Sequence, residues 1–166
     1  HGELMHADSI HFPDSLKYQT KKLARTVYGG GGIMPDFFVP IDTTQYTDYH
    51  RNIVAKGVVI KTTMKFIESH RKELQSKYKK FETFNDKFEI SDEILANMQT
   101  LAEQEKIKFD EKQYRKSLPL IKTQLKALIA RDLWDMNEYF QIMNTTDSSV
   151  IQALKVLNEG AYEKVV

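Results

Sequence analysis

Four consecutive glycines, Gly29–Gly32, followed closely by Pro35, constrain this chain more than any other feature. A glycine run lets the backbone adopt positive φ angles and lie close against another element. Pro35 fixes its own φ angle and biases Met34 toward an extended conformation. Because β-favouring residues stand on both sides of the run, at 25–28 and 37–39, the segment is predicted to form a strand, a tight crossing and a second strand.

The predicted β part is short. Residues 17–27 are expected to form one or two strands, and residues 37–41 another. Strands this short are marginal alone, so they are expected to join a larger sheet. Without that sheet they would expose an edge, which a second copy of the chain could cover. Residues 1–16 show no sustained helical or strand period and are interpreted as a connector.

From Thr47 onward the apolar residues recur at spacings of three and four, which predicts helices. One long helix is expected from a cap at Thr47 to about Tyr78. Residues 79–90 are expected to be extended or irregular, and held to the helices by three phenylalanines. Ser91 is expected to cap a second helix, which ends near Ile107.

Asp110 is predicted to start a third helix. Pro119 interrupts its pattern, and a proline inside a helix costs about 3 kcal/mol or more. A kink or break is therefore predicted near Ser117, followed by a longer helix to Met143. A last helix is expected to stop at Gly160. The predicted fold is mainly α with a small β part (α+β), a short β hairpin followed by a bundle of about four helices.

Composition excludes several function classes. With 41% hydrophobic residues in 166, the chain can bury a core. Its 24 Lys and Arg residues against 23 Asp and Glu residues create no broad field for nucleic acid or an anionic membrane surface, so no nucleic-acid partner is expected. The absence of cysteine excludes disulfides and thiolate metal sites. No apolar run reaches the roughly 18 residues of a membrane span.

Two groups of residues suggest ligand binding, but each has a simpler explanation. The run Gly29–Gly32 is not followed by Lys-Ser/Thr, so it does not match a phosphate-binding loop. His6, Asp8 and His11 could present metal ligands, but the set lacks a third histidine or the compact spacing of zinc sites. No metal or cofactor site is therefore predicted.

Three further sets on the helices are interpreted as non-catalytic. They are the histidines His50 and His70, the serines Ser69, Ser76 and Ser117, and the aromatic residues Trp134, Tyr139 and Phe140. Solvated helix positions explain the histidines. The serines stand among charged residues, where a lysine stays protonated and cannot act as a base. The aromatic residues could bind a partner, although core packing is the more frequent fate of such a stripe.

The region around the glycine run resembles the last β segment of carboxyl-terminal processing (tail-specific) serine peptidases, in the form seen in Bacteroides-like bacteria. The shared pattern is Tyr-x-Thr, a Gly-Arg pair, then Gly-Ile-x-Pro-Asp. Its structural motif residues here are Tyr18, Thr20, Arg25, Gly29, Gly30, Gly31, Gly32, Ile33, Pro35 and Asp36. Ala24 departs from the pattern, since glycine is usual there, and residues 21–23 look like altered turn residues. Residues 125–134 are similar to the C-terminal helix of the same subgroup.

This resemblance implies proteolysis by a Ser/Lys dyad that lies upstream of the glycine run. Neither the serine at a helix start nor the Gly-Lys-Gly-like strand is present in the 166 residues, so this chain alone is expected to cleave nothing. Because it begins at His1 without an initiator methionine or a signal peptide, it is interpreted as the C-terminal piece of a longer precursor. The implied parts are a connector (1–16), the closing β segment of the protease core (17–42) and a C-terminal helical domain (43–166).

The implied partners are the rest of the parent protease, with its core sheet and PDZ domain, and the protein substrates of that enzyme. A homo-oligomer is possible, and the implied location is the periplasm or cell envelope. The rival interpretation is a non-enzymatic helical module for protein–protein interaction or oligomerisation, whose hairpin joins a partner's sheet. The sequence upstream would distinguish the two.

Overall fold

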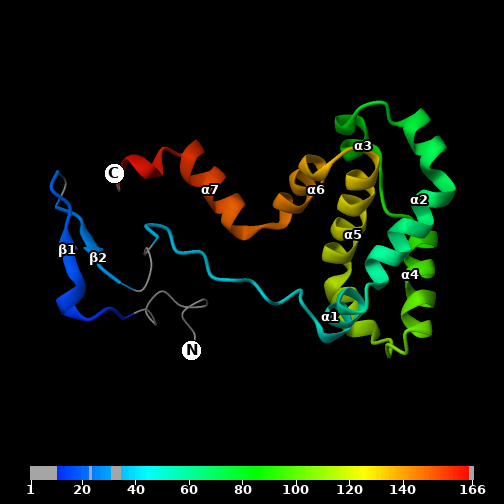
Figure 1. Cartoon of the computed structure of the whole chain (residues 1–166), viewed down its shortest axis with the longest axis horizontal. Helices are drawn as coiled ribbons and strands as arrows, with labels where there is room; N and C mark the ends of the chain where they lie inside the picture. The colour runs from blue at the N-terminus through cyan, green and yellow to red at the C-terminus, as the bar shows by residue number, and fades with distance from the viewer. Residues whose placement is uncertain (1–10, 23, 31–34, 165–166) are drawn as a thin grey trace. The chain divides into compact units, whose positions relative to one another are not determined.

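A computed structural model describes residues 11–22, 24–30 and 35–164, which fall into two compact units. One unit joins the residues up to Asp42 with those from Ser148 onward, and the other is Thr43–Asp147. The described residues contain seven α-helices and one two-stranded sheet (Figure 1). The predicted mainly helical α+β fold is therefore confirmed.

The first unit contains the β hairpin. A short 3-10 helix, η2 (Asp14–Leu16), leads into β1 (Lys17–Gln19), which pairs antiparallel with β2 (Thr26–Tyr28) (Figure 1). Tyr18 lies opposite Val27 in this register. The unit also holds α7 (Ser148–Asn158) and η4 (Ala161–Lys164).

The prediction of a strand at residues 37–41 is wrong. This segment has no strand, and the turn of the hairpin lies at residues 20–25 rather than at the glycine run. Phe37, Phe38 and Val39 are half-buried and line an apolar pocket together with residues of α7. The segment thus buries its side chains against a helix, and its backbone pairs with no strand among the described residues.

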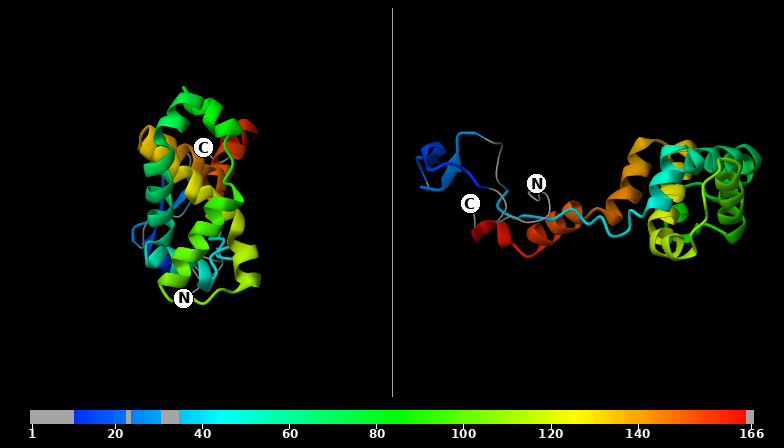
Figure 2. Two further views of the ribbon diagram at one scale, coloured as in Figure 1. Left: turned by 90° about the vertical axis from the view of Figure 1, so that its right-hand side faces the viewer. Right: turned by 90° about the horizontal axis from the view of Figure 1, so that it is seen from below.

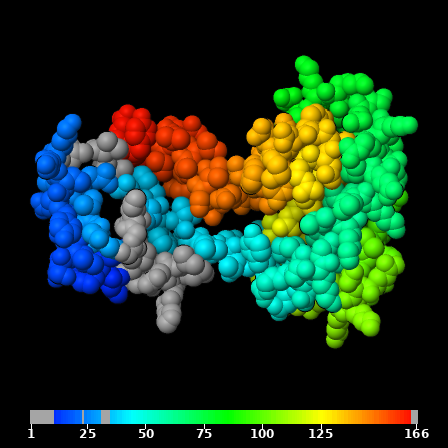
Figure 3. Space-filling model, in the orientation of Figure 1, coloured from blue at the N-terminus to red at the C-terminus, as the bar shows by residue number. Residues whose placement is uncertain are grey.

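The second unit is a helical bundle. Its elements are α1 (Asp48–Ala55), α2 (Val58–Lys77), α3 (Phe81–Lys87), α4 (Asp92–Gln104), α5 (Glu111–Leu133), α6 (Met136–Met143) and η3 (Asn144–Thr146). Helix α5 packs against α1, α2 and α6, and α2 also packs against α4 (Figures 1 and 2). Side chains of α2 and α6 form much of the face seen in Figure 3.

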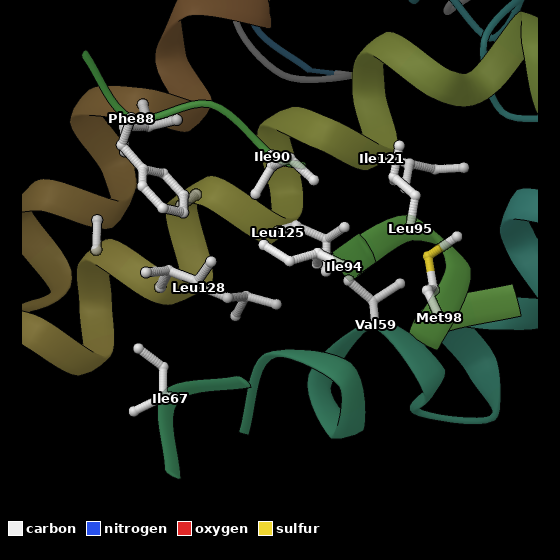
Figure 4. Packing of buried hydrophobic residues seen from close by; sticks show 14 of the residues in the cluster. Val59, Ile67, Phe88, Ile90, Ile94, Leu95, Met98, Ile121, Leu125 and Leu128 are labelled. Carbon is white, nitrogen blue, oxygen red and sulfur yellow. The ribbon is translucent and has the colours of Figure 1, made fainter. Parts of the chain in front are cut away.

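The core of the bundle lies between α2, α4 and α5. Side chains from all three helices point into a common interior (Figure 4). Ile121, Leu125 and Ile129 of α5 have no exposed surface, and neither has Met98 of α4. Fully burying a side chain of this kind stabilises the fold by roughly 1.5–3 kcal/mol. The core therefore holds the helices together without help from the first unit.

Three helix starts are capped as predicted. The Thr47 hydroxyl accepts the His50 amide at 3.3 Å, and the Ser91 hydroxyl accepts the amide of the third residue after it at 3.4 Å. The Asp110 carboxylate accepts both the backbone N–H and the side-chain amide of Gln113, at 2.9 and 3.1 Å. Side-chain oxygens at these positions satisfy amides that have no partner within the helix.

The long helix predicted from Thr47 to Tyr78 is broken in two. Helix α1 ends at Ala55 and α2 begins at Val58, because Gly57 between them has a φ angle of 70°. A left-handed residue ends a helix, and glycine adopts that conformation without a steric cost. Apolar side chains on both sides of the break are fully buried, so each helix places its own face in the core.

The irregular segment predicted at 79–90 contains a helix. The three phenylalanines are Phe81, Phe84 and Phe88, and their spacings of three and four put them on one side of α3 and its C-cap. Their exposures are 8%, 0% and 8%. The prediction that these phenylalanines hold the segment to the helices is confirmed.

Pro119 causes no break near Ser117. Helix α5 runs through it from Glu111 to Leu133, and the break lies at Trp134, whose φ and ψ angles of −127° and −98° are not helical. Asp135 then caps α6 by accepting the Met136 amide at 2.5 Å. Pro119 is exposed, so the carbonyl that loses its helical donor can bond to water instead.

The C-terminal helix is grouped differently from the expected domains. We expected the helical domain to span residues 43–166, whereas α7 belongs to the compact unit that contains the hairpin. Helix α7 ends shortly before Gly160, which has a φ angle of 64°, as the predicted stop requires. Across the described ranges, no helix combines the length and the apolar character needed to cross a lipid bilayer.

Replacing Gly57 by alanine tests the break between α1 and α2. Nothing lies within 4 Å of a Cβ atom added there, so the cost is conformational and should lower the free energy of unfolding by about 1–2 kcal/mol in urea denaturation. Ser76→Ala, at an exposed position inside α2, is the control and should stay within about 0.5 kcal/mol of wild type. Increased stability of Gly57→Ala would mean that α1 and α2 can fuse into one helix.

Candidate functional site

The motif residues of the hairpin are joined by direct contacts within the first unit. Thr20 closes the turn through both its backbone and its side chain. Its backbone N–H donates to the Arg25 carbonyl at 2.9 Å, and its hydroxyl oxygen accepts the Arg25 amide at 3.1 Å. The strand pairing thus extends one residue beyond β1 and β2. Thr20 and Arg25 fix where the turn begins and ends.

Ala24 occupies the position where the peptidase pattern that this region resembles has glycine. Its φ angle is 50°, in the left-handed region, and its amide donates to the Thr20 carbonyl at 3.1 Å. This conformation costs an L-residue with a Cβ atom about 1–2 kcal/mol, whereas glycine adopts it freely. The turn geometry therefore gives a physical reason for glycine at this position.

An ion pair links the turn to the segment after the glycine run. The Arg25 guanidinium donates to an Asp36 carboxylate oxygen, and the two side chains are 40% and 47% exposed. In the sequence the two residues lie on either side of the glycine run, and the pair brings them into direct contact. Pro35, also a motif residue, precedes Asp36 and is exposed.

The first two glycines of the run serve close packing. A Cβ atom at Gly29 would lie 2.6 Å from Cε2 of Tyr18, so the tyrosine ring rests directly on the glycine backbone. A Cβ atom at Gly30 would come within 3.3 Å of the Leu16 side chain. At these two positions the absence of a side chain leaves room for Tyr18 and Leu16. The motif residues Gly31, Gly32 and Ile33, and the candidate ligands His6 and Asp8, lie outside the described residues.

The hairpin is arranged for pairing and packing. Tyr18 and Val27, which lie opposite each other, are 57% and 43% exposed. On the other face the Tyr28 ring stacks on Phe12, with ring centroids 4.2 Å apart. Two short strands leave backbone groups free along both outer edges. Among the described residues, the hairpin thus offers a sheet edge and one apolar face that is about half exposed.

His50 does not occupy the solvated position predicted for it. The side chain is 1% exposed, and Nε2 lies 2.9 Å from the Gln124 side-chain oxygen of α5. Its Nδ1 atom is buried and has no hydrogen-bond partner in the described part of the chain. His70 is half-buried, because its ring stacks on Phe66 with centroids 4.4 Å apart. Packing between helices, which the local sequence does not show, accounts for both.

Ser117 is also placed differently from the prediction, which put it among charged residues. It is fully buried; its hydroxyl donates to the Gln45 carbonyl at 2.6 Å and lies 2.8 Å from the Thr47 hydroxyl. These bonds tie the start of the bundle to α5. Ser69 donates to a carbonyl of its own helix at 3.0 Å, and Ser76 is exposed. The contacts of Ser117 and Ser69 are those of structural hydroxyls.

The aromatic residues near the end of α5 divide into two groups. Trp134 packs against Phe81 and Phe84, with ring centroids 5.9 and 5.2 Å apart. Tyr139 is half-buried against the core, whereas Phe140 is 52% exposed. Core packing therefore accounts for Trp134 and Tyr139. Within the described ranges, no three His, Cys, Asp or Glu side chains are grouped as metal ligands would be.

Tyr49 is a buried phenol whose hydroxyl has no hydrogen-bond partner among the residues that the structure describes. The residue is 3% exposed, and its ring meets Phe109 and Tyr114 edge-on at centroid distances of 5.6 and 6.0 Å. Burial is the main cause that raises the pKa of Tyr49 to about 12, with smaller contributions from Tyr114 and Glu103. The low-polarity site holds the phenol in its neutral form.

Replacing Ala24 by glycine tests the strained turn. Glycine relieves the left-handed strain in the folded turn, but it also increases the entropy of the unfolded chain. The net effect should stabilise the hairpin by about 0.5–1 kcal/mol. Hydrogen exchange of the Arg25 amide, which bonds to Thr20, should slow accordingly. The control is Ala153→Gly inside α7, where glycine should weaken the helix. Faster exchange of Arg25 in Ala24→Gly would contradict this account of the turn.

Replacing Tyr49 by phenylalanine tests its burial. An unfolded tyrosine ionises near pH 10, and the folded one only near 12, so wild type should lose stability as pH rises through this range. The variant has no phenol to ionise, so it should not lose this stability at high pH. At pH 8 its free energy of unfolding should equal that of wild type or exceed it by up to about 1 kcal/mol. Urea unfolding at pH 8 and pH 11 measures both effects. A difference between the two proteins that is the same at both pH values would show that Tyr49 ionises freely.

Comparison with known proteins finds one family. Residues 49–135 match the family described as "Family of unknown function (DUF8443)". The match starts at Tyr49 in α1 and ends at Asp135, the cap of α6, so it lies within the helical bundle. No curated protein and no solved structure matches the chain. Since the matched region covers more than half of the 166 residues, the chain belongs to this family of unknown function.

Proposed function

We propose that the chain is the C-terminal region of a carboxyl-terminal processing serine endopeptidase. In this proposal the hairpin completes the core sheet of the parent enzyme, and the helical bundle is a non-catalytic extension. The observation that carries it is the set of contacts among the motif residues. Thr20 bonds to Arg25, Arg25 pairs with Asp36, and the Tyr18 ring covers Gly29.

These contacts explain the resemblance in physical terms. Each of the motif residues in these contacts touches another motif residue. The contacts span the whole motif, from Tyr18 to Asp36. Ala24, the one departure, has a backbone conformation that suits the glycine usual in the family. Two proteins with the same backbone geometry need similar residues at positions that contact one another, and the shared pattern falls on such positions.

The size of the sheet supports the same proposal. Strands β1 and β2 form three residue pairs, and an isolated two-stranded hairpin is at best marginally stable in water. The exposed Tyr18 and Val27 would gain a partner surface if the hairpin joined a larger sheet. The core sheet of a peptidase would supply that surface.

The parent enzyme, by resemblance, would bind the exposed C-terminal end of an envelope protein through its PDZ domain and cleave it by acyl transfer with a Ser/Lys dyad. Both catalytic residues would lie upstream of the glycine run in the sequence. The enzyme would be located in the periplasm or cell envelope. None of the serines considered above is assigned a catalytic role in this proposal. The bundle would contribute to oligomer assembly or to gating of the substrate.

A second candidate is a non-enzymatic helical module for interaction or oligomerisation. The observation that favours it is the extent of the family match, which covers residues 49–135 and leaves out the hairpin. A bundle with its own core can serve as a separate module. In that case the hairpin would add its strands to the sheet of a partner protein.

Two matched arginine variants of the full-length precursor test the proposal. Arg25→Ala removes the ion pair with Asp36, and Arg115→Ala removes an exposed ion pair with Glu111 on α5. Cleavage of an unstructured peptide with a free C-terminus is measured for both variants. Misplacing a core strand should lower kcat/KM by about tenfold to a hundredfold in Arg25→Ala. Arg115→Ala should cleave as wild type does.

The outcomes separate the two candidates. Loss of cleavage in Arg25→Ala alone supports the peptidase. Cleavage by a precursor from which residues 17–42 have been deleted would contradict a role in the core sheet. If the wild-type precursor cleaves nothing and its upstream sequence lacks a Ser/Lys pair, the interaction module is the better account.

A further inference from the structure

Lys126 lies on α5 at a pocket of about 400 Å³ in the helical bundle. The pocket is formed by α3 and the segment after it, by α5, and by the end of α6 with η3. Its lining includes the apolar side chains of Phe88, Ile90 and Ile142 and the amine of Lys122, one helical turn before Lys126. A small molecule that reaches the pocket would thus meet apolar side chains, two amines and the carboxylate of Glu89.

The amine of Lys126 bonds to a neutral partner. Its Nζ atom donates to the backbone carbonyl of Asn85 in α3 at 2.6 Å, and it lies 6.0 Å from the centroid of the Phe84 ring. The acceptor is neutral, so this bond supplies no full negative charge to balance the ammonium. A lysine held in this way is more easily converted to the free amine than one paired with a carboxylate.

Burial lowers the pKa of Lys126, and the carboxylates of Glu89 and Asp86 oppose the shift without reversing it. Lys17, by contrast, pairs with Asp14, and that bond raises the pKa of Lys17. A lysine whose pKa is lowered by burial gives up its proton more readily, and the free amine is the form that acts as a nucleophile. Geometry and ionisation therefore agree at this position.

We propose that Lys126 is a site of covalent acylation by small acyl phosphates. The neutral amine attacks the carbonyl carbon, a C–N bond forms, and the bond from that carbon to the phosphate oxygen breaks. Phosphate leaves with the electron pair, and the proton lost from nitrogen passes to water. The acyl phosphate supplies the activated group, so the step needs no oxidant or reductant.

The surroundings of Lys126 match this class of reagent. Lys122 can attract the phosphate group, and Phe88 and Ile142 can contact a short acyl chain. The product keeps one N–H on the acylated nitrogen, which can still donate to the Asn85 carbonyl. Acylation would remove the charge of Lys126 and leave the link between α3 and α5 in place.

Site-resolved mass spectrometry of the full chain after treatment with acetyl phosphate tests the proposal. Lys116, exposed on the same helix, is the internal control. Acetylation of Lys126 should exceed that of Lys116 several-fold in the folded protein, and the two should be equal in concentrated urea. Equal or lower acetylation of Lys126 in the folded protein would overturn the proposal.

A variant of the neighbouring lysine tests the choice of reagent. Lys122→Gln should reduce acetylation of Lys126 by acetyl phosphate several-fold, and should leave its reaction with an uncharged N-hydroxysuccinimide ester unchanged. Circular dichroism and urea unfolding would establish that the variant folds. If both reagents react equally well in the variant and in wild type, Lys122 has no part in attracting the phosphate, and the assignment to acyl phosphates is wrong. Neither result depends on whether the parent chain is a peptidase.

Discussion

Burial of α5 among its neighbours is the interaction on which the helical bundle depends. Ile121, Leu125 and Ile129, spaced four residues apart along this helix, have no exposed surface. The same helix contacts α1, α2 and α6, so a change in its position would move all three. The hydrogen bonds from Ser117 to Gln45 and from His50 to Gln124 then determine how the start of the bundle meets α5. Buried polar bonds of this kind add specificity to a core that apolar burial stabilises.

The hairpin is held together by weaker interactions. Its ladder has three residue pairs, and the ion pair between Arg25 and Asp36 is partly exposed, a kind of pair that contributes about 0–1 kcal/mol. The Tyr18 ring packs on the Gly29 backbone, but this contact does not form a buried core. A β segment with defined geometry and little stability of its own is suited to joining a larger sheet. This contrast between the hairpin and the bundle underlies the proposed role in a protease core.

Local signals predicted part of the fold. The caps at Thr47, Ser91 and Asp110 and the α+β class were confirmed, because hydroxyl and carboxylate caps act within one turn. The break at Gly57, helix α3 and the continuous α5 across Pro119 were missed, because each depends on which face meets the core. Buried His50 and Ser117 were missed for the same reason. At the hairpin, the pattern named the motif residues, but only the structure shows that Arg25 meets Asp36 and that Ala24 has a positive φ angle.

The central claim is that the bundle folds by its own core, whereas the hairpin needs a larger sheet. Amide hydrogen exchange, followed residue by residue in this chain and in the proposed peptidase precursor, tests it most directly. The account predicts strong protection for α5 in both proteins. It predicts that Tyr18, Thr20 and Val27 exchange rapidly in this chain and slowly in the precursor. Protection of these hairpin amides in this chain equal to that of α5, or no gain of protection in the precursor, would contradict the claim.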